Sequence, residues 1–413
     1  MNSAIKLKIV MKGDTLSGKK VILGVSGGIA AYKACLIVRN LVKRGAEVRV
    51  IMTPSALEFI TPLTLSTLSG NEVIVNIFPE TQKNGVSLKT WHIEYALWAD
   101  LMIIAPATIN TIAKISNGFA DNALTTVAAA LRCPLLVAPA ADMDMYNNPV
   151  NRENLRKLKD LLGAIIVNGE QGFLASGLSG MGRMADPEKI IDMAEICLAG
   201  FKQDLFGRKI LVTAGPTFED VDPVRFIGNR SSGKMGFQIA KSAYLRGAEV
   251  TLVSGPSSEK AYPEIKLIKV RSASQMKLAV EENLISNDTL IMSAAVADYR
   301  PDNVSMKKIK KEDSLSSISL VKTDDILSCL DKAGKTIVGF ALETDEELKN
   351  AQDKLKRKNL DMIVLNSLND KNAGFEFDTN KITVIKNTGE RKDYPLHSKF
   401  ITANNILTEL NKL

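Results

Sequence analysis

Histidine and cysteine, the residues that most often build metal sites and disulfides, are scarce in this sequence. Its 413 residues include two histidines, and its four cysteines are widely separated and form no CxxC pair. A His/Cys zinc cluster and a disulfide-stapled fold are therefore excluded. We expect four buried, reduced thiols: Cys35, Cys133, Cys197 and Cys329.

Long hydrophobic runs are also missing. No apolar run reaches about 18 residues without a charge, so the sequence predicts no transmembrane helix and no membrane partner. The N-terminus lacks a signal-peptide pattern, which predicts a cytoplasmic protein. The first nine residues fit no recognisable element, so translation starts at either Met1 or Met11.

Aromatic residues are few, at 5%, and the basic residues are mixed with acidic ones. This composition is not typical of a nucleic-acid-binding protein, so no nucleic-acid partner is predicted. The formal net charge of +7 instead favours small anionic ligands, of which phosphorylated metabolites are the simplest.

A repeated pattern is the main feature of what the sequence does contain. A strand-like run, a glycine-rich turn and a helix lead to the pentapeptide Arg44-Gly-Ala-Glu-Val48, and the same order of elements leads to Arg246-Gly-Ala-Glu-Val250. Each pentapeptide opens an apolar strand that ends in a Pro-Ser turn. The sequence predicts an α/β protein with two tandem doubly wound, Rossmann-like parallel-sheet domains at 19–198 and 208–413, joined by a linker at 199–207. An alternating segment at 381–386 predicts an edge strand or hairpin.

The glycine- and serine-rich segment 225–236 lies between the first strand and first helix of the second repeat. Such a loop offers backbone N–H groups and the positive end of a helix dipole to an anion, and Lys234 adds a charge. The expected ligand is a phosphate.

Small polar residues follow three strands of the first half, in the segments 24–30, 105–111 and 139–146. The carboxyl ends of parallel strands meet at one edge of a sheet, where ligands bind. We therefore expect a cofactor held by backbone groups and hydroxyls. A tight strand-to-helix turn alone also favours glycine, so it is the combination that carries the prediction.

These segments, with Trp91-His-Ile-Glu94 and Gly180-Met-Gly-Arg-Met184, resemble the flavin-dependent cysteine decarboxylases, specifically the phosphopantothenoylcysteine decarboxylase half of the bifunctional coenzyme A biosynthesis proteins. The resemblance implies a flavodoxin-like N-terminal domain that binds FMN. The implied FMN contacts are Ser26, Gly27, Gly28, Thr53, Ser55, Ala107, Thr108 and Asn110.

The resemblance also makes His92 the catalytic base. FMN takes a hydride as the cysteinyl thiol loses its proton, and the resulting thioaldehyde accepts electrons as the carboxylate leaves. Histidine suits this proton transfer near neutral pH. The alternative is a histidine with a structural role at a helix cap.

Two positions depart from the family pattern. Asp142 stands where an asparagine binds the substrate carboxylate, and Ser176 stands where a cysteine donates a proton in the final reduction. An ionised aspartate repels a carboxylate, and a hydroxyl is a far weaker acid than a thiol. Either the two changes are matched, or the decarboxylase is damaged and the flavin domain serves as a scaffold for a ligase. The neighbouring substrate contacts are present: Met145, Arg183 and Met184.

The second half resembles the phosphopantothenate-cysteine ligase half of the same family over about residues 208–410. That family uses CTP and Mg²⁺ to convert the carboxylate of 4′-phosphopantothenate into an acyl cytidylate, from which cysteine displaces CMP. Asn229 matches the residue that holds this intermediate, and Ala294 and Ala295 offer backbone contacts. The implied CTP contacts are Asp298, Lys308, Phe340, Lys354 and Lys358.

The basic run at 307–311 has a simpler interpretation as a solvated face, and Thr323-Asp-Asp-Ile326 departs slightly from the family pattern. The resemblance further implies a homo-oligomer, with trimers of the flavin domain and dimers of the ligase domain. Two other functions are disfavoured. A phosphatase-regulating subunit is disfavoured because the sequence has no acidic tail, and a nicotinamide dehydrogenase because neither glycine loop reads GxGxxG.

Overall fold

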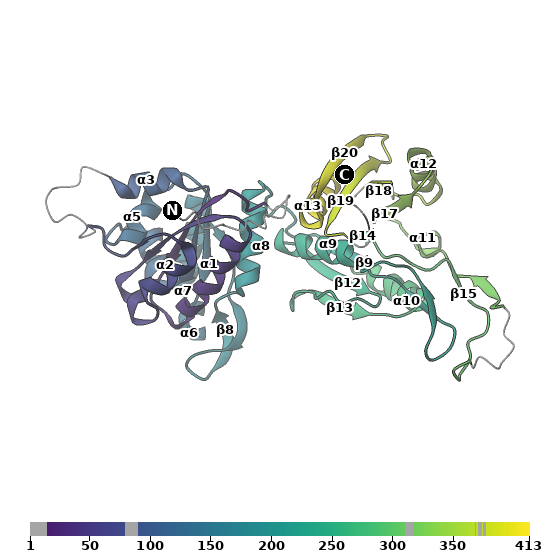
Figure 1. Ribbon diagram of the computed structural model, residues 1–413, viewed down its shortest axis with the longest axis horizontal. Helices are drawn as coiled ribbons and strands as arrows, with labels where there is room; N and C mark the ends of the chain where they lie inside the picture. Colours follow the sequence, from purple (N-terminus) through teal and green to yellow (C-terminus); the bar gives the residue numbers. More distant parts are fainter. Residues whose placement is uncertain (1–14, 79–89, 310–316, 368, 371–373, 375–376) are drawn as a thin grey trace, which may run out of the picture. The chain divides into compact units, whose positions relative to one another are not determined.

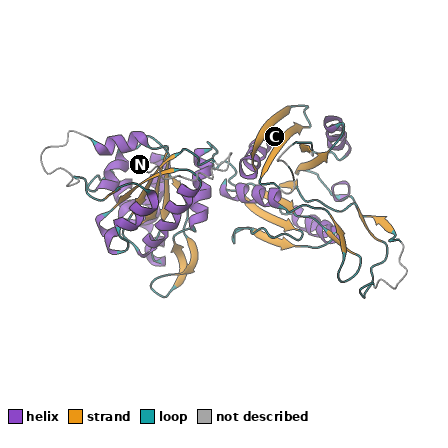
Figure 2. Cartoon of the chain, viewed as in Figure 1, coloured by secondary structure: helices purple, strands orange, loops and turns teal. Residues whose placement is uncertain are grey.

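The computed structural model describes residues 15–78, 90–309, 317–367, 369–370, 374 and 377–413. The question of Met1 or Met11 as the start lies outside these residues, as do Lys310 and Lys311. The chain divides into two compact units, residues 1–201 and 202–413. Figures 1 and 2 show that each unit contains strands flanked by helices. The domain and linker boundaries given above stay predictions.

The first unit is built on a parallel sheet with the strand order β3-β2-β1-β4-β5-β6. The chain runs outward from β1 in both directions, so the loops after β1 and β4 diverge at the point where such sheets bind ligands. The strands are β1 (Lys20–Val25), β2 (Glu47–Met52), β3 (Val73–Ile74), β4 (Leu101–Ala107), β5 (Leu135–Pro139) and β6 (Ile165–Ile166).

Helices cover this sheet because its strands are apolar on both faces. In β1 every residue after Lys20 is buried, and all seven residues of β4 are buried. The helical segments are η1 (Ile29–Lys33), α1 (Ala34–Lys43), η2 (Pro54–Glu58), α2 (Pro62–Ser69), α3 (Trp91–Trp98), α4 (Ile109–Ser116), α5 (Ala123–Ala129), α6 (Met143–Asn147), α7 (Pro149–Leu162) and α8 (Pro187–Leu198). An antiparallel hairpin, β7 (Glu170–Phe173) and β8 (Ser179–Arg183), stands apart from the sheet.

The second unit has a sheet in the order β13-β12-β9-β14-β17-β18-β19-β20. Its first six strands pair in parallel, and β19 and β20 form the edge hairpin that the alternating pattern predicts. The sheet strands are β9 (Lys209–Ala214), β12 (Glu249–Ser254), β13 (Lys266–Lys269), β14 (Thr289–Met292), β17 (Thr336–Glu343), β18 (Met362–Ser367), β19 (Thr379–Lys386) and β20 (Arg391–Ser398).

Two separate hydrophobic clusters show that this sheet is covered on both faces. Alternate side chains of a strand point to opposite faces. Ile210 and Val212 of β9 pack with α9 and α13, whereas Leu211 packs with α10 and α12. The helices are α9 (Lys234–Leu245), α10 (Ala273–Leu284), α11 (Ile326–Cys329), α12 (Glu347–Arg357) and α13 (Lys399–Leu410); short strand pairs are β10 (Phe218–Asp220) with β11 (Phe226–Gly228) and β15 (Tyr299–Pro301) with β16 (Leu320–Lys322). The predicted α/β fold class is confirmed.

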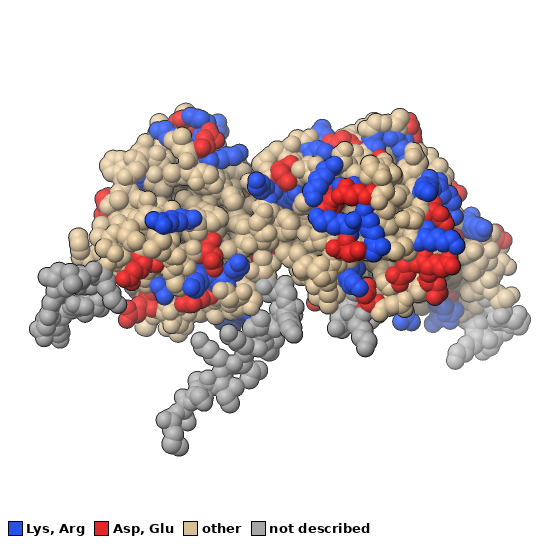
Figure 3. Space-filling view, turned by 90° about the horizontal axis from the view of Figure 1, so that it is seen from above, with Lys and Arg blue, Asp and Glu red and all other residues tan. Residues whose placement is uncertain are grey.

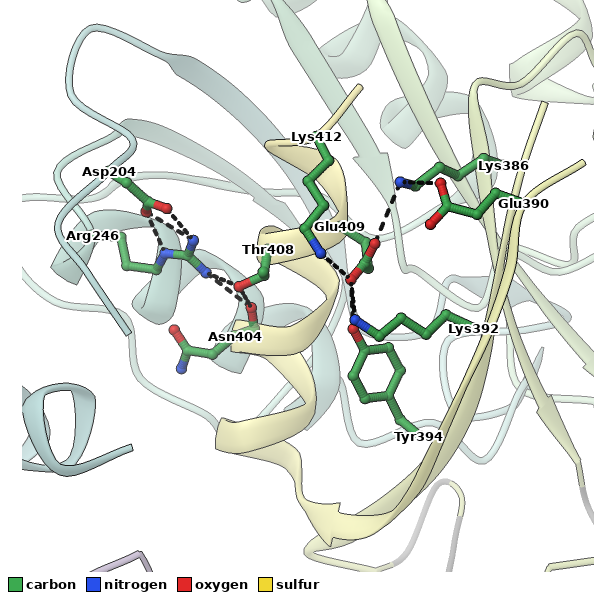
Figure 4. A network of polar contacts seen from close by, with 10 residues as sticks. All are labelled: Asp204, Arg246, Lys386, Glu390, Lys392, Tyr394, Asn404, Thr408, Glu409 and Lys412. Atoms are coloured by element: carbon green, nitrogen blue, oxygen red, sulfur yellow. Dashed lines mark hydrogen bonds and ion pairs between the residues drawn. The ribbon is translucent and has the colours of Figure 1, made fainter. Parts of the chain in front are cut away.

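Polar contacts hold α13 against α9 (Figure 4). Arg246, whose side chain is 1% exposed, forms an ion pair with Asp204 at 2.8 Å and donates to the carbonyl of Asn404 at 2.9 Å. Five residues further along the same helix, the buried Glu409 accepts hydrogen bonds from Lys392 of β20 and from other groups that Figure 4 labels. The second half of the last helix is therefore fixed by polar contacts to both α9 and β20.

The four thiols form no disulfide, but the prediction that they are all buried is wrong. Cys329 is exposed, and the other three are partly exposed. Burial nevertheless raises the pKa of the Cys133 thiol to about 11 and that of Cys197 to about 12. These two thiols are poor proton donors at neutral pH.

No helix in the described residues is both long and apolar enough to cross a membrane. On the face seen in Figure 3, basic and acidic side chains are interspersed.

Candidate active sites

The first unit contains a cavity of about 890 Å³ at the carboxyl ends of β1, β2, β4 and β5. We call it the first cavity. It brings together most of the residues predicted to bind FMN or substrate: Gly27, Gly28, Thr53, Ser55, Thr108, Asn110, Asp142, Met145, Arg183 and Met184.

The glycine turn after β1 is shaped by a close approach between two loops. A Cβ atom on Gly27 would lie 2.5 Å from the Cβ of Ser55, which no side chain can do, so only glycine fits there. The hydroxyl of Thr53 is buried and has no hydrogen-bond partner in the described part of the chain. Buried hydroxyls normally have a partner, so this one points to a ligand in the cavity.

The Ser26 side chain forms hydrogen bonds within the protein. Its Oγ donates to the carbonyl of Pro106 at 2.7 Å and accepts from the N–H of Thr108 at 2.9 Å. The side chain thereby joins the loop after β1 to the loop after β4. Among the described residues, neither Ser26 nor Ala107 lines the cavity, so a direct contact with a cofactor stays a prediction for both.

Charged side chains line the polar part of the first cavity. Lys33 donates to the carbonyl of Met184 at 3.2 Å, and burial, followed by the charge of Arg183, lowers its pKa. Lys114 and Asp121 form an ion pair at 2.5 Å, and the hydrogen bond from Lys114 lowers the pKa of the carboxyl.

Asp142 and Ser176, the two residues that differ from the family pattern, are in direct contact. Asp142 precedes α6, and Ser176 lies in the turn between β7 and β8. The Ser176 hydroxyl donates a hydrogen bond to Oδ2 of Asp142. The hairpin is also tied to the strand end because the N–H of Ala141 donates to the carbonyl of Gly182 at 3.0 Å. A change at one position therefore alters the surroundings of the other.

His92 lies outside the first cavity. It is in the first turn of α3, where its ring meets the Trp91 ring edge-on at a centroid distance of 5.9 Å. No histidine is among the described residues that line the cavity. Within one copy of the chain, the structure does not bring the predicted base to the predicted cofactor site.

The second unit contains a cavity of about 350 Å³, which we call the second cavity. It lies at the carboxyl ends of β14 and β17 and at the start of α9. Six predicted ligase residues line it: Asn229, Ala294, Ala295, Asp298, Phe340 and Lys354.

Asn229 is fixed by the backbone that follows β14. Its Nδ2 donates to the carbonyls of Ala295 and Val296, both at 3.1 Å. Beyond it, Gly233 has a φ of 82°, in the left-handed region that favours glycine, and lets the chain turn into α9. At the start of α9 the N–H groups of Gly233 and Lys234 donate to the hydroxyls of Ser231 and Ser232, at 3.2 and 3.5 Å.

The three lysines predicted to bind CTP differ in their position relative to the second cavity. Lys354 donates to the carbonyl of Phe340 at 2.8 Å, and burial, followed by the charge of Lys358, lowers its pKa. Lys358 forms an ion pair with Asp325 at 2.8 Å and does not line the second cavity. Lys308 is exposed and does not line it either. The contacts of these two with CTP stay predictions.

Lys399 also lines the second cavity, and sequence reasoning missed it. It begins α13, and its nearest sequence signal is Ser398, which caps that helix by accepting from the N–H of Ile401 at 3.3 Å. This pattern predicts a helix start but gives no indication of a cavity formed by the distant α9.

Comparisons with known proteins agree with this two-unit arrangement. A family model described as "Flavoprotein" matches residues 10–197, and one described as "DNA/pantothenate metabolism flavoprotein C-terminal domain" matches residues 205–413. The chain is 42% identical over 402 residues to the "Coenzyme A biosynthesis bifunctional protein CoaBC" of Bacillus subtilis, covering 96% of this chain and 98% of that protein. The chain belongs to the CoaBC family.

Two further relatives of this CoaBC-family chain are informative. A "Cysteine/Cysteine sulfinic acid decarboxylase" from an unknown prokaryotic organism is 46% identical over 358 residues, covering 85% of this chain and 98% of that protein. The crystal structure of a CoaBC C-terminal domain is 40% identical and covers 51% of this chain and 96% of its own, with a TM-score of 0.44.

Proposed function

We propose that this chain catalyses two consecutive steps of coenzyme A biosynthesis. The second unit joins 4′-phosphopantothenate to cysteine with CTP, and the first decarboxylates the product to 4′-phosphopantetheine. The observation that carries the proposal is that a chain matching 98% of a CoaBC relative forms, in each unit, a cavity lined by most of the site residues predicted for that unit.

The first cavity suits FMN. Its loops after β1 and β2 approach so closely that only glycine fits at position 27, and the Thr53 hydroxyl has no described protein partner. Gly27, Gly28, Thr53, Ser55 and Asn110 would hold the cofactor, which supplies two-electron oxidation of the cysteinyl thiol and later returns the electrons. Lys33 and Arg183 add positive charge to the same cavity and would attract an anionic substrate.

His92 would act from a neighbouring copy of the chain. The residue lies outside the cavity of its own unit, and the family implies trimers of the flavin domain. In such an assembly one copy supplies the cofactor loops and another the base that takes the thiol proton. We further propose dimers of the ligase domain and a cytoplasmic location.

In the second cavity the substrate carboxylate attacks the α-phosphate of CTP, pyrophosphate leaves, and the amine of cysteine then displaces CMP. Lys354 would neutralise charge that develops on the phosphates, while the backbone-held Asn229 orients the acyl cytidylate without adding charge. The described residues contain no cluster of His, Cys, Asp or Glu that could hold a metal. We propose that Mg²⁺ enters bound to the phosphates of CTP.

A second substrate class is favoured by Asp142. Free cysteine carries an α-ammonium group, whereas the same nitrogen is a neutral amide in 4′-phosphopantothenoylcysteine. Both substrates carry the carboxylate that leaves as CO₂, so the difference lies at the nitrogen, where a carboxylate in the first cavity attracts the ammonium group but not the amide. The relative named a cysteine/cysteine sulfinic acid decarboxylase makes free cysteine the competing substrate to test.

The deciding experiment supplies the purified full chain with 4′-phosphopantothenate, cysteine and CTP, and follows pyrophosphate, CO₂ and the thiol products by mass spectrometry. The proposal expects CTP-dependent ligation followed by 4′-phosphopantetheine. Parallel reactions with preformed 4′-phosphopantothenoylcysteine and with free cysteine separate the two substrate classes. CO₂ from free cysteine alone would favour the second class, and ligation without CO₂ from either would refute the decarboxylase.

A further inference from the structure

Residues 323–325, which we call the tether segment, join β16 to α11 and contact the loop that follows β14. They lie within Thr323-Asp-Asp-Ile326, which departs slightly from the family pattern. The Thr323 hydroxyl donates to the carbonyl of Ala297 at 2.6 Å, and the Thr323 N–H donates to the carbonyl of Asp298 at 3.0 Å. Asp298 lines the second cavity and is a predicted CTP contact. The first residue of the tether segment therefore fixes the backbone that carries this contact.

The last residue of the tether segment holds a second predicted CTP contact. Asp325 forms an ion pair with Lys358 at 2.8 Å and accepts a hydrogen bond from the Ser328 hydroxyl at 2.9 Å. Burial would raise the pKa of Asp325, but the hydrogen bonds from Lys358 and Ser328 lower it, so the carboxylate is charged at neutral pH. Lys358 lies one turn after Lys354, which lines the second cavity. The tether segment thus contacts the backbone of Asp298 at its start and the side chain of Lys358 at its end.

The middle residue of the tether segment is held by α10. Lys277 donates to Oδ2 of Asp324 at 2.7 Å, and this hydrogen bond lowers the pKa of Asp324 and raises that of Lys277. The Lys277 side chain is 23% exposed, whereas that of Asp324 is 68% exposed. The residue before Lys277, Met276, is fully buried in the hydrophobic cluster between α10 and the sheet. Lys277 therefore extends from a fixed helix to an exposed segment, and the described lining of the second cavity includes neither member of the pair.

The effect of this pair is expected at the tether segment rather than on the whole unit, because solvent screens an exposed ion pair. We propose that Lys277 and Asp324 are positioning residues for the ligation: their ion pair holds the tether segment against α10 and thereby keeps Asp298 and Lys358 in place for CTP. The assignment rests on the proposed ligase function and on these two predicted CTP contacts. The pair can bias the position of the segment by no more than its own interaction free energy, so its loss should change CTP use a few-fold without abolishing activity.

The test compares variants of the full chain in a pyrophosphate-release assay at saturating 4′-phosphopantothenate and cysteine. In Lys277→Met the KM for CTP should rise about 3- to 5-fold while kcat changes by less than about twofold. Lys277→Arg keeps the charge and should recover most of the loss. Lys266→Met is the matched control, because Lys266 also contacts α10, donating to Asn283 at 2.9 Å near the other end of the helix. The control should match the wild type.

A double-variant cycle separates positioning from a general structural effect. Asp324→Asn should raise the KM for CTP as much as Lys277→Met does, and the double variant should raise it no further, because each change removes the same contact. Without ligand, hydrogen exchange of peptides that span residues 317–330 should be faster in Lys277→Met than in the wild type. The unfolding midpoint should shift by less than about 3 °C, since the pair is exposed.

Calorimetric titration with CTP, without the acid or cysteine, separates this inference from the ligase proposal. The wild type should bind CTP about 3- to 5-fold more tightly than Lys277→Met even if no ligation occurs. Equal CTP binding and equal KM in the two proteins, or additive losses in the double variant, would overturn the inference and leave the ligase proposal intact. A wild type that binds no CTP would refute both.

Discussion

Replacing Glu409 by glutamine tests how strongly the last helix is fixed. The carboxylate is fully buried, and its Oε1 accepts from Lys392 and Lys412, both at 2.8 Å, and from Tyr394 at 2.7 Å (Figure 4). Lys386 lies 3.4 Å from Oε2. Glutamine keeps the shape of the side chain but removes the charge.

The magnitude follows from the pKa of Glu409. Burial alone would raise it, but the hydrogen bonds from Lys392, Lys412 and Tyr394 lower it from 4.5 to about 2. At about 1.4 kcal/mol per pKa unit, the charged form is worth about 3 kcal/mol of unfolding free energy above pH 5. Because the pKa is lower in the folded state, this contribution is present above the unfolded pKa and is lost as the pH falls through about 2.

Hydrogen exchange on peptides from β19, β20 and α13, followed by mass spectrometry, measures this free energy. Glu409→Gln should lower it by about 3 kcal/mol at pH 7, and the difference should shrink as the pH falls from about 5 towards 2. Glu346→Gln, which breaks an exposed pair with Lys349, should change it by less than about 1 kcal/mol. Tryptophan fluorescence would not measure this change, because both tryptophans, Trp91 and Trp98, lie in the first unit. A loss below about 1 kcal/mol for Glu409→Gln, or one independent of pH, would refute the reasoning.

Three further experiments test the two cavities. Thr53→Val should weaken FMN binding roughly tenfold in a flavin titration without changing the unfolding midpoint of the flavin-free protein, because the hydroxyl has no described partner there. Asp142→Asn and Ser176→Cys should each lower CO₂ release from 4′-phosphopantothenoylcysteine more than the double variant does, since the two side chains touch; additive losses would count against a matched pair. Lys354→Met should lower kcat/KM for CTP by about 100-fold in a pyrophosphate-release assay, whereas an unchanged value would remove Lys354 from the site.

Local patterns in the sequence predict the sheet and the regions of both cavities. Continuous apolar runs such as Leu101–Ala107 form the buried strands, and small residues at their carboxyl ends line the cavities, because parallel strands bring those ends together. The paired pentapeptides at residues 44 and 246 occupy equivalent places between the first helix and second strand of each sheet. These features depend on residues close in sequence.

The contacts that were not predicted join distant segments. Ser176 meets Asp142 because a hairpin outside the main sheet folds back to the end of β5. Lys399 reaches the second cavity because α13 packs along α9, although the sequence shows only a helix start there. His92 is the opposite case, since its motif matched the family while the single chain keeps it away from the cavity. Which segments meet is decided by tertiary packing, for which one sequence carries no local signal.

The position of α13 has a consequence for how the protein is made. The first unit is complete by residue 201, whereas the second needs its final helix to cover α9 and complete the cavity wall at Lys399. At about 5–20 residues per second, a ribosome takes on the order of tens of seconds to synthesise the rest of the chain. The first unit can thus fold before α13 of the second unit has been synthesised. A chain that ends a dozen codons early would contain a complete first unit and a second unit without its final helix.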